Sequence, residues 1–315
     1  MVALRDRPLF TTEFDAASPL RPIAGAVYIF GLSTEDRSQH VDQLKLTSPD
    51  VRFVEISESA ESQFRTIGSE QIVDSRKRRQ ISDWVRALSE PVVYLDITGL
   101  SHNIWAPLVK LLVEEKRCFR IVYVEPSEYR HNPTPRQGDI FDLSERITGI
   151  RPIPLFASLD DRPSDNVCFV ALLGFEGTRL SHMLEQVQPP IDKVYPLIGA
   201  PGFRPEYPFF TYLGNSNPLV NSGASRNVRY AQSNCPFAAY YAIADIAARF
   251  PDDLIKIGLV GTKPHAIAAI LHAIRSPDSV ELVYDQAIRK KKRTEGVAKC
   301  LVYDISEFLP HCGLG

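Results

Sequence analysis

The sequence predicts an α/β protein made of two tandem Rossmann-like lobes, each with a mainly parallel sheet flanked by helices. Three observations support this prediction. Short apolar strands alternate with helical patterns along the chain, which is typical of parallel sheets with right-handed crossover connections. Some strands, such as Val92–Ile97, are almost entirely apolar, as expected when helices cover both faces of a sheet. The same succession of strands and glycine turns also occurs in both halves of the 315-residue chain.

The repeated unit begins in each half with a strand that runs into a glycine turn. Val27–Phe30 leads to the turn Gly31–Arg37, and Val167–Leu173 leads to the turn Gly174–Arg179. Later in each half, another strand has its own glycine turn: Val92–Ile97 with Gly99, and Ile255–Val260 with Gly261. A closing strand then ends at an acid: Phe119–Val124 at Glu125, and Val280–Tyr284 at Asp285. The interval from this second glycine to the acid is 26 positions in the first half and 24 in the second. Such matching order and spacing predicts an internal duplication.

Further elements follow from the periodicity of the apolar residues. The longest is a helix predicted over Glu61–Leu88, in which the apolar stripe is interrupted. The remaining elements are shorter: helices His102–Lys116, Phe237–Phe250 and Pro264–Ile274, and strands Val51–Ile56, Lys193–Ile198 and Ala298–Ile305.

Composition predicts the domain boundaries. Residues 1–20 are polar and lack periodicity, so we expect an N-terminal arm. Prolines are concentrated within 126–166, which predicts a boundary between a first lobe over 21–150 and a second lobe over 151–315. Within the second lobe, 199–235 is rich in Gly, Pro, Asn and Ser and is expected to form a long loop with a functional or partner-contacting role.

The overall composition is typical of a soluble globular protein. A formal net charge of −2 gives no support for a chain-wide attraction to nucleic acid or a membrane surface. The basic runs Arg76–Arg79 and Lys290–Arg293 are expected to be solvated faces, so nucleic acid is an alternative partner but not the favoured one. The five cysteines include no C-x-x-C pair, and no apolar run approaches the ~20 residues that span a bilayer. We therefore expect a cytoplasmic protein with free thiols and no membrane contact.

The repeated turns are the candidate ligand site, because ligands of open α/β sheets bind at the carboxyl ends of the strands, near helix N-termini that favour anions. The arginine that ends each first turn would either bind a phosphate or pair with a neighbouring acid. For the turns Thr98–His102 and Gly261–His265, the alternative is a capped strand-to-helix turn without a ligand. The predicted ligand-binding residues are Gly31, Ser33, Arg37, Thr98, Gly99, Ser101, His102, Gly174, Glu176, Arg179, Gly261, Thr262, Lys263 and His265.

No cofactor and no metal ion is expected. No Gly-x-Gly-x-x-Gly follows a strand and no Gly-x-x-x-x-Gly-Lys-Ser/Thr occurs, which disfavours dinucleotide cofactors and P-loop chemistry. His265 and His272 lie seven positions apart on one predicted helix, without further ligands at helical spacing. No Gly-x-Ser-x-Gly motif marks a nucleophile, so the sequence assigns no catalytic residue.

The strand Ile255–Val260, followed by Gly261-Thr262-Lys263-Pro264 and an alanine-rich helix, resembles the signature of CRISPR-associated Rossmann-fold (CARF) sensor domains. The resemblance implies binding of a cyclic oligonucleotide at a dimeric cleft, here with both units in one chain, as in fused sensors of anti-phage signalling. The sequence departs from the family where Val260 stands in place of a second glycine and where Leu100-Ser101 stands in place of Thr-Lys. The resemblance therefore implies that only the second lobe keeps a phosphate-binding lysine. Many such sensors carry a fused nuclease, for which this chain has no room, so the effector would be a separate polypeptide.

The sequence thus predicts a regulatory sensor of a nucleotide-type ligand that acts with a separate effector in bacterial anti-phage defence. A protein without enzymatic activity is favoured, and two alternatives stay open. A nucleotide- or nucleoside-processing hydrolase, such as a phosphodiesterase or N-glycosidase, would draw its acid–base chemistry from Glu35, Asp36, Glu125 or Glu176. A structural subunit of a defence complex would dock through the segment 199–235.

Overall fold

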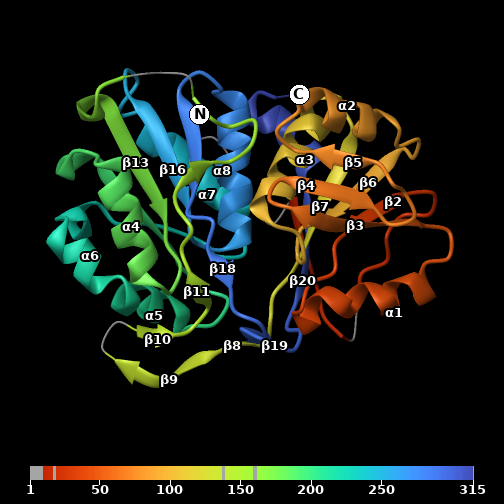
Figure 1. Cartoon of the computed structure of the whole chain (residues 1–315), viewed down its shortest axis with the longest axis horizontal. Coiled ribbons are helices and arrows are strands. Elements are labelled where there is room, and N and C mark those ends of the chain that lie inside the picture. Colours follow the sequence, from red (N-terminus) through yellow and green to blue (C-terminus); the bar gives the residue numbers. More distant parts are fainter. Residues whose placement is uncertain (1–9, 17–18, 137–138, 159–161, 315) are drawn as a thin grey trace. The chain divides into compact units, whose positions relative to one another are not determined.

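The computed structural model describes residues 10–16, 19–136, 139–158 and 162–314, and these fold into two compact lobes (Figure 1). Of the described residues, 10–129 and 291–314 form the first lobe, and those from 130 to 290 form the second. Each lobe has a mainly parallel sheet flanked by helices, so the predicted α/β class with two Rossmann-like lobes is confirmed.

The first lobe is built on an eight-stranded sheet in the order β1-β20-β7-β6-β2-β3-β4-β5. The four central strands are parallel, and the strands outside them pair antiparallel with their neighbours. The strands are β1 (Thr11–Phe14), β2 (Val27–Phe30), β3 (Arg52–Ala60), β4 (Gln63–Thr66), β5 (Ile72–Asp74), β6 (Val92–Asp96), β7 (Cys118–Val124) and β20 (Cys300–Asp304).

Helices cover both faces of this sheet, with α1 on one side and α2 and α3 on the other (Figure 1). They are α1 (His40–Thr47), α2 (Arg78–Arg86), α3 (His102–Glu114) and α9 (Ile305–Phe308), with single 3₁₀ turns η2 (Asp36–Gln39) and η6 (Leu309–Cys312). The helix predicted over His102–Lys116 is therefore present as α3. Eleven of its thirteen residues are buried, which agrees with its apolar composition.

The second lobe has a six-stranded sheet in the order β12-β17-β16-β13-β14-β15, in which only β12 is antiparallel. Its strands are β12 (Arg151–Pro152), β13 (Val167–Leu172), β14 (Val194–Gly199), β15 (Arg229–Ala231), β16 (Leu254–Leu259) and β17 (Val280–Tyr284). Its helices are α4 (Gly177–Val187), α5 (Tyr207–Gly214), α6 (Ser216–Asn221), α7 (Pro236–Ala247) and α8 (Lys263–Arg275). In Figure 1, α4 and α6 lie on one side of the sheet, and α7 and α8 on the other.

The four parallel strands that the lobes have in common occur in the same order. In the first lobe the order is β7-β6-β2-β3, and in the second it is β17-β16-β13-β14. In both lobes, the first of these four strands along the chain lies between the second and the third. The chain therefore adds the second strand on one side of the first, and the third strand on its other side. The glycine turns of the repeated unit follow these neighbouring first and third strands. The internal duplication itself stays a prediction.

Short strand pairs hold the segments through which the chain passes from one lobe to the other. In the first lobe, β8 (Glu128–Tyr129) pairs with β19 (Thr294–Glu295). In the second lobe, β11 (Ser144–Arg146) pairs with β18 (Ile288–Arg289), and β9 (His131–Arg136) forms a hairpin with β10 (Asp139–Phe141). The proline-rich segment 126–166 therefore contains five short strands, β8 to β12.

The prediction of a long helix over Glu61–Leu88 is wrong for the first part of this range. The structure has β4 and β5 there, and a helix only over α2. Gly68 has a φ of +87° and Ser62 a φ of 64°, and each lies in a turn that a continuous helix could not contain. The apolar side chains Phe64 and Val73 are buried in the strands instead.

The long loop predicted over 199–235 is also wrong, because this segment contains α5, α6, the 3₁₀ turn η5 (Ala224–Asn227) and β15. Some of its prolines and glycines lie at helix ends. Pro208 lies in the first turn of α5, where the missing N–H costs nothing. Gly223 has a φ of 68° and terminates α6.

The domain division differs from the boundaries predicted at 20/21 and 150/151. Residues 130–150 belong to the second lobe, and the C-terminal strand β20 belongs to the first, where it pairs with β7 and β1. Within the predicted N-terminal arm, 1–9 and 17–18 lie outside the described residues, and Thr11–Phe14 forms the edge strand β1.

We predict that deletion of residues 300–315 unfolds the first lobe but leaves the second folded. The deletion removes the buried side chains of Leu301, Val302 and Tyr303, whose burial stabilises the lobe by roughly 5 kcal/mol, and it exposes the edge of β7. Amide hydrogen exchange should show loss of protection in β6 and β7 and unchanged protection in β13 and β16. Deletion of 313–315 alone is the control, and unchanged protection of β7 in the longer deletion would contradict the prediction.

Candidate functional site

The glycine turns of each lobe contact each other at the carboxyl ends of neighbouring strands. A Cβ atom on Gly99 would lie 1.8 Å from the carbonyl oxygen of Gly31. In the second lobe, a Cβ atom on Gly174 would lie 2.5 Å from the oxygen of Val260, and one on Gly261 would lie 3.0 Å from that of Leu173. The structure therefore brings Gly31 to Gly99 and Gly174 to Gly261. The packing of one turn on the other already requires these glycines, whether or not a ligand binds.

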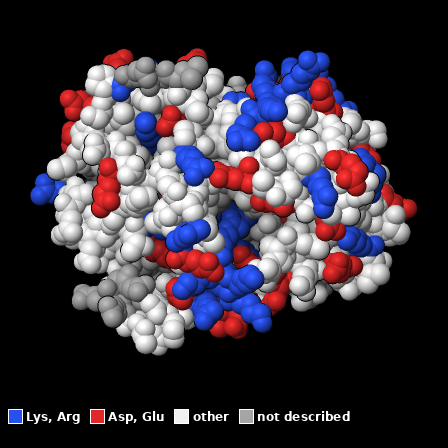
Figure 2. Space-filling view, viewed as in Figure 1, with Lys and Arg blue, Asp and Glu red and all other residues white. Residues whose placement is uncertain are grey.

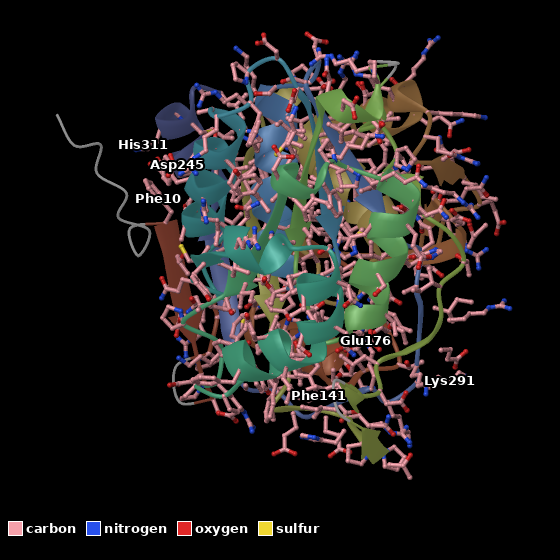
Figure 3. All side chains as sticks on the ribbon, turned by 90° about the vertical axis from the view of Figure 1, so that its left-hand side faces the viewer. Phe10, Phe141, Glu176, Asp245, Lys291 and His311 are labelled. Atoms are coloured by element: carbon pink, nitrogen blue, oxygen red, sulfur yellow. The ribbon has the colours of Figure 1, made fainter. Side chains whose placement is uncertain are left out.

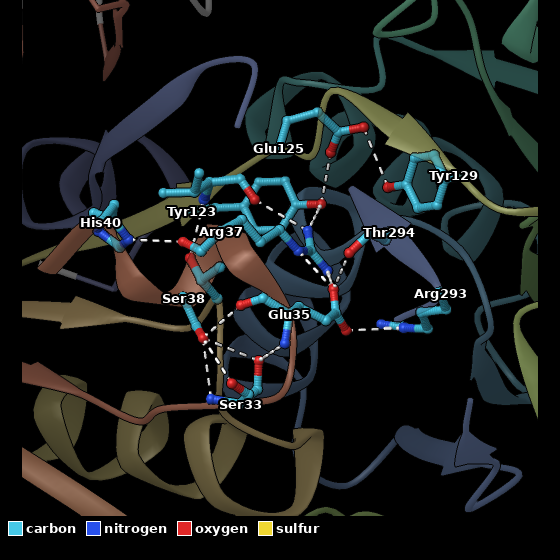
Figure 4. Close-up of polar contacts among 12 residues, drawn as sticks. Ser33, Glu35, Arg37, Ser38, His40, Tyr123, Glu125, Tyr129, Arg293 and Thr294 are labelled. Atoms are coloured by element: carbon cyan, nitrogen blue, oxygen red, sulfur yellow. Dashed lines mark hydrogen bonds and ion pairs between the residues drawn. The ribbon is translucent and has the colours of Figure 1, made fainter. Parts of the chain in front are cut away.

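Arg37 is buried in the first lobe and bonded to the end of β7 (Figure 4). Its Nε donates to Glu35 Oε2 at 2.8 Å, and its Nη1 donates to the hydroxyl of Tyr123 and to the carbonyl of Val124, both at 3.0 Å. The sequence left Arg37 either to bind a phosphate or to pair with a neighbouring acid. In the structure it pairs with Glu35, and this ion pair orients the turn. Ligand contact by Arg37 stays a prediction and would require this network to open.

Glu125 is a buried acid of this network with a raised pKa. The hydroxyls of Tyr123 and Tyr129 donate to its two oxygens at 2.7 and 3.2 Å. Burial raises the pKa of Glu125 from 4.5 to about 7, although these hydroxyls and the Arg37 guanidinium act to lower it. Glu125 therefore changes protonation near neutral pH, inside the protein.

Glu35 bonds residues 293–294, where the chain has returned to the first lobe, to the turn Gly31–Arg37. Its Oε1 accepts from Arg293 Nε at 2.9 Å, and its Oε2 accepts from the hydroxyl of Thr294 at 2.8 Å (Figure 4). Arg293 thus has an acid partner within the lobe, and in the second lobe Lys290 pairs with Asp142. Two of the four cations in the run Lys290–Arg293 are therefore neutralised.

The second lobe has corresponding contacts at its own first turn. Both nitrogens of the Arg179 fork, Nε and Nη2, donate to Asp285 at 2.6 Å, and Asp285 directly follows the closing strand β17. Glu176, labelled in Figure 3 at the start of α4, accepts from the backbone N–H groups of Leu143 and Ser144 at 3.1 and 2.9 Å. It also accepts from the Ser144 hydroxyl at 2.7 Å. In both lobes, therefore, a glutamate of the first turn bonds to a connecting segment. An arginine of the same turn bonds to the end of the closing strand, which is β7 in the first lobe and β17 in the second.

The turn Gly261–His265 forms the N-terminus of the thirteen-residue helix α8. Thr262 is the N-cap residue, and its hydroxyl accepts from the His265 N–H at 3.4 Å. Lys263 is buried in the first turn of the helix. His265 is fully buried, its Nε2 bonds to the carbonyl of Gln232 at 3.1 Å, and burial lowers its pKa to about 4. His265 is therefore neutral at pH 7, and because a carbonyl only accepts, its proton lies on Nε2.

The polar residues at the turns of the first lobe have internal contacts. Ser33 donates its N–H to the hydroxyl oxygen of Ser38 at 3.0 Å. The hydroxyl of Thr98 accepts from the Val124 N–H at 3.0 Å. Ser101 stands at the N-cap position of α3 without a side-chain capping bond, and its N–H donates to Glu58 at 2.6 Å. His102 is buried, with its ring 5.3 Å from the ring of Trp105. Ligand contact by the turn Thr98–His102 stays a prediction.

One buried ion pair was missed by the sequence analysis. Asp96, at the end of β6, lies 3.0 Å from His40 Nε2 and accepts from the Tyr28 hydroxyl at 3.0 Å. Burial opposes ionisation of Asp96, but the ion pair with His40 prevails and lowers its pKa below the usual value. The pKa of His40 is correspondingly raised by Asp96, against the effect of its own burial. The signal in the sequence was the single acid within the otherwise apolar run Val92–Ile97.

The other basic run, Arg76–Arg79, is largely neutralised. Arg76 pairs with Asp74 at 2.8 Å and Arg78 with Glu114 at 2.9 Å, while Arg79 lies 4.0 Å from Asp83. Figure 2 shows cationic and anionic side chains interspersed over much of the visible face. Among the described residues, no group of His, Cys, Asp and Glu side chains is placed to hold a metal ion, and no helix is long and apolar enough to cross a membrane.

We predict that Glu125→Gln changes how the stability of the protein depends on pH. A carboxyl with a higher pKa in the folded than in the unfolded chain stabilises the fold at low pH, and this contribution is lost as the pH rises through the folded-state value. For a rise from 4.5 to about 7, the loss between pH 5 and 8 is about 2–3 kcal/mol. Urea unfolding should show that Glu125→Gln gains this amount relative to the wild type over the same range.

The control for this prediction is Glu70→Gln, which neutralises an exposed acid in the same lobe. Its unfolding free energy should follow the wild-type pH profile. Parallel profiles for wild type and Glu125→Gln would show that Glu125 does not titrate as its buried position requires.

Comparisons with known proteins do not assign the chain to a family. No family model and no curated protein matches it. A type III CRISPR defence DNA nuclease activated by cyclic oligoadenylate is similar with a TM-score of 0.41 and 10% identity, over 82% of this chain and 65% of that chain. The transcriptional regulator CelR in complex with cellobiose is similar with a TM-score of 0.28 and 13% identity, over 84% of this chain and 68% of that chain. This chain thus spans less than two thirds of the nuclease chain, and neither similarity supports a conclusion about function.

Proposed function

We propose that this protein is a sensor for a nucleotide-type ligand and regulates a separate effector in bacterial anti-phage defence. The observation that carries the proposal is the position of the turn Gly261-Thr262-Lys263. It lies at the carboxyl end of β16, next to β13, where the strand order of the second lobe reverses. In open α/β sheets, this switch point is where ligands bind.

The chemistry of the turn favours an anion. The first N–H groups of α8 and the helix dipole favour negative charge at the half-exposed Gly261 and Thr262. Lys263 is buried beside this turn, where a contact between its ammonium group and a phosphate would be screened less by water. The corresponding turn of the first lobe has Leu100-Ser101 and no lysine. We therefore propose that the second lobe binds the phosphates of the ligand.

The surroundings of this turn offer a means of regulation. Arg179 Nη1 lies 3.5 Å from the carbonyl of Val260, the residue before Gly261, and the same guanidinium holds Asp285. A ligand that displaces the turn would act on this arginine and, through α4, on the contact between Glu176 and Ser144. Binding would then shift the population of conformations of the connecting segment, which an effector could recognise.

The alternative of a nucleotide- or nucleoside-processing hydrolase is less well supported. The carboxylate oxygens of Glu35 and Glu176 accept hydrogen bonds that hold connecting segments. Glu125 has a pKa of about 7, suited to acid–base catalysis, but it is 2% exposed and bonded to two tyrosines. The alternative of a structural subunit would have 199–235 dock as folded helices rather than as a loop.

We predict that isothermal titration against a panel of linear and cyclic nucleotides detects binding that depends on Lys263. Lys263→Met removes the charge and keeps most of the volume, and it should weaken binding about ten-fold or more, because a charge-assisted contact to phosphate is lost. Lys292→Met, at an exposed position, is the matched control and should bind like the wild type. Chromatography of the titrated nucleotides should show no turnover.

Three outcomes would contradict the proposal. The first is absence of binding across the panel, and the second is equal affinity of wild type and a folded Lys263→Met variant. The third is turnover that is lost in Glu125→Gln, which would establish the hydrolase alternative.

A further inference from the structure

A groove of about 490 Å³ lies in the second lobe between the edge strand β15 and helix α7. This volume falls within the range of small-molecule sites, about 300–1,000 Å³. The strand contributes Arg229 and Tyr230, and the helix contributes Tyr241 and Asp245, the latter labelled in Figure 3. Arg249 follows directly after the helix and completes the cationic lining. None of these residues belongs to the predicted site at the switch point.

Both arginines of the groove have guanidinium nitrogens without protein partners among the described residues. Arg249 is exposed, and its side chain makes no ion pair or hydrogen bond there. Arg229 donates only through Nη1, to the carbonyls of Asn227 and Val228 at 3.3 and 3.1 Å. Its guanidinium is also held 5.4 Å from the centre of the Tyr195 ring. Arg229 is therefore fixed in place with Nε and Nη2 available, which suits an anion that presents two oxygens to the fork, as a phosphate does.

The aromatic residues of the groove give it a second kind of surface. Tyr230 is 59% exposed at the centre of β15, a large apolar area for a residue that forms part of a concave site. Tyr241 lies on α7 across the groove, and the small side chain of Ala242 beside it leaves space between strand and helix. A planar ring could therefore pack on tyrosine while its charged group meets the arginines.

We infer that this groove binds a small aromatic anion, such as an aryl phosphate or the monophosphate end of a nucleotide. The two guanidinium groups would bind the anion, and the tyrosines would pack on the ring. With two arginines and one aspartate, the charged lining carries a net positive charge, which disfavours a cationic or neutral ligand.

The groove is also connected to the switch-point turn. Gln232 lines the groove, and its carbonyl oxygen bonds to the ring of His265 at 3.1 Å. The next residue, Ser233, accepts from the Thr262 hydroxyl at 3.4 Å. A ligand in the groove would therefore affect the turn that starts α8 through Gln232 and Ser233.

The test uses phenyl phosphate as the probe and isothermal titration of the full chain. Binding should be retained in Lys263→Met, because the switch-point lysine is not part of the groove, and weakened about ten-fold in Arg249→Ala. Arg226→Ala, which removes an exposed arginine elsewhere in the lobe, is the matched control and should not change the affinity. Tyr230→Ser should weaken phenyl phosphate more than inorganic phosphate, since only the former has a ring.

The outcomes separate this inference from the proposed function. Loss of phenyl phosphate binding in Lys263→Met but not in Arg249→Ala would place the anion at the switch point and overturn the groove as a site. Equal binding of phenyl and inorganic phosphate would overturn the role of the tyrosines. Binding of an acidic peptide but not of phenyl phosphate, lost in Arg249→Ala, would show that the groove takes an extended peptide and overturn the small-molecule ligand.

Discussion

The close approach of two backbone turns in the middle of each sheet is the constraint on which the rest of the structure depends. Strands β2 and β6 are neighbours in the first lobe, as are β13 and β16 in the second, so the turns that follow them must leave the sheet side by side. Gly31 with Gly99, and Gly174 with Gly261, leave no room for a side chain between them. This contact fixes where α3 and α8 begin, and hence which N–H groups face the carboxyl end of the sheet.

Near these turns, charged side chains form ion pairs and hydrogen bonds within the protein. Burying an ion pair costs solvation energy, and the cost is offset only when most of the polar atoms are bonded. Arg37 meets this condition through Glu35, Tyr123 and Val124, and Arg179 meets it through two bonds to Asp285. Glu35 and Glu176 accept further hydrogen bonds from connecting segments. The result is that the segments entering and leaving each lobe are bonded to the same turns that would respond to a ligand.

The positions of the central strands along the chain and those of α3, α7 and α8 could be predicted from the sequence, because continuous apolar runs and helical periodicity are local signals. The order of the strands in each sheet was not predicted. The segment 61–88 could not be predicted, since β4 and β5 are only four and three residues long, too short for their alternation to be told apart from a helical stripe. At the site, the sequence located the turns but not the partners of their side chains. Arg293 meets Glu35 across 258 positions, and Asp285 meets Arg179 across 106. Such distant pairing, and the groove beside the three-residue strand β15, depend on the assembled sheet.

The path of the chain has a consequence for biosynthesis. Among the described residues, the first lobe is made of two stretches of sequence with the second lobe between them, and the strand that covers β7 is translated only after that second lobe. A ribosome therefore releases a complete second lobe while the sheet of the first still lacks a member. Because domains fold as units during synthesis, the later half of the sequence would reach its native state before the earlier half.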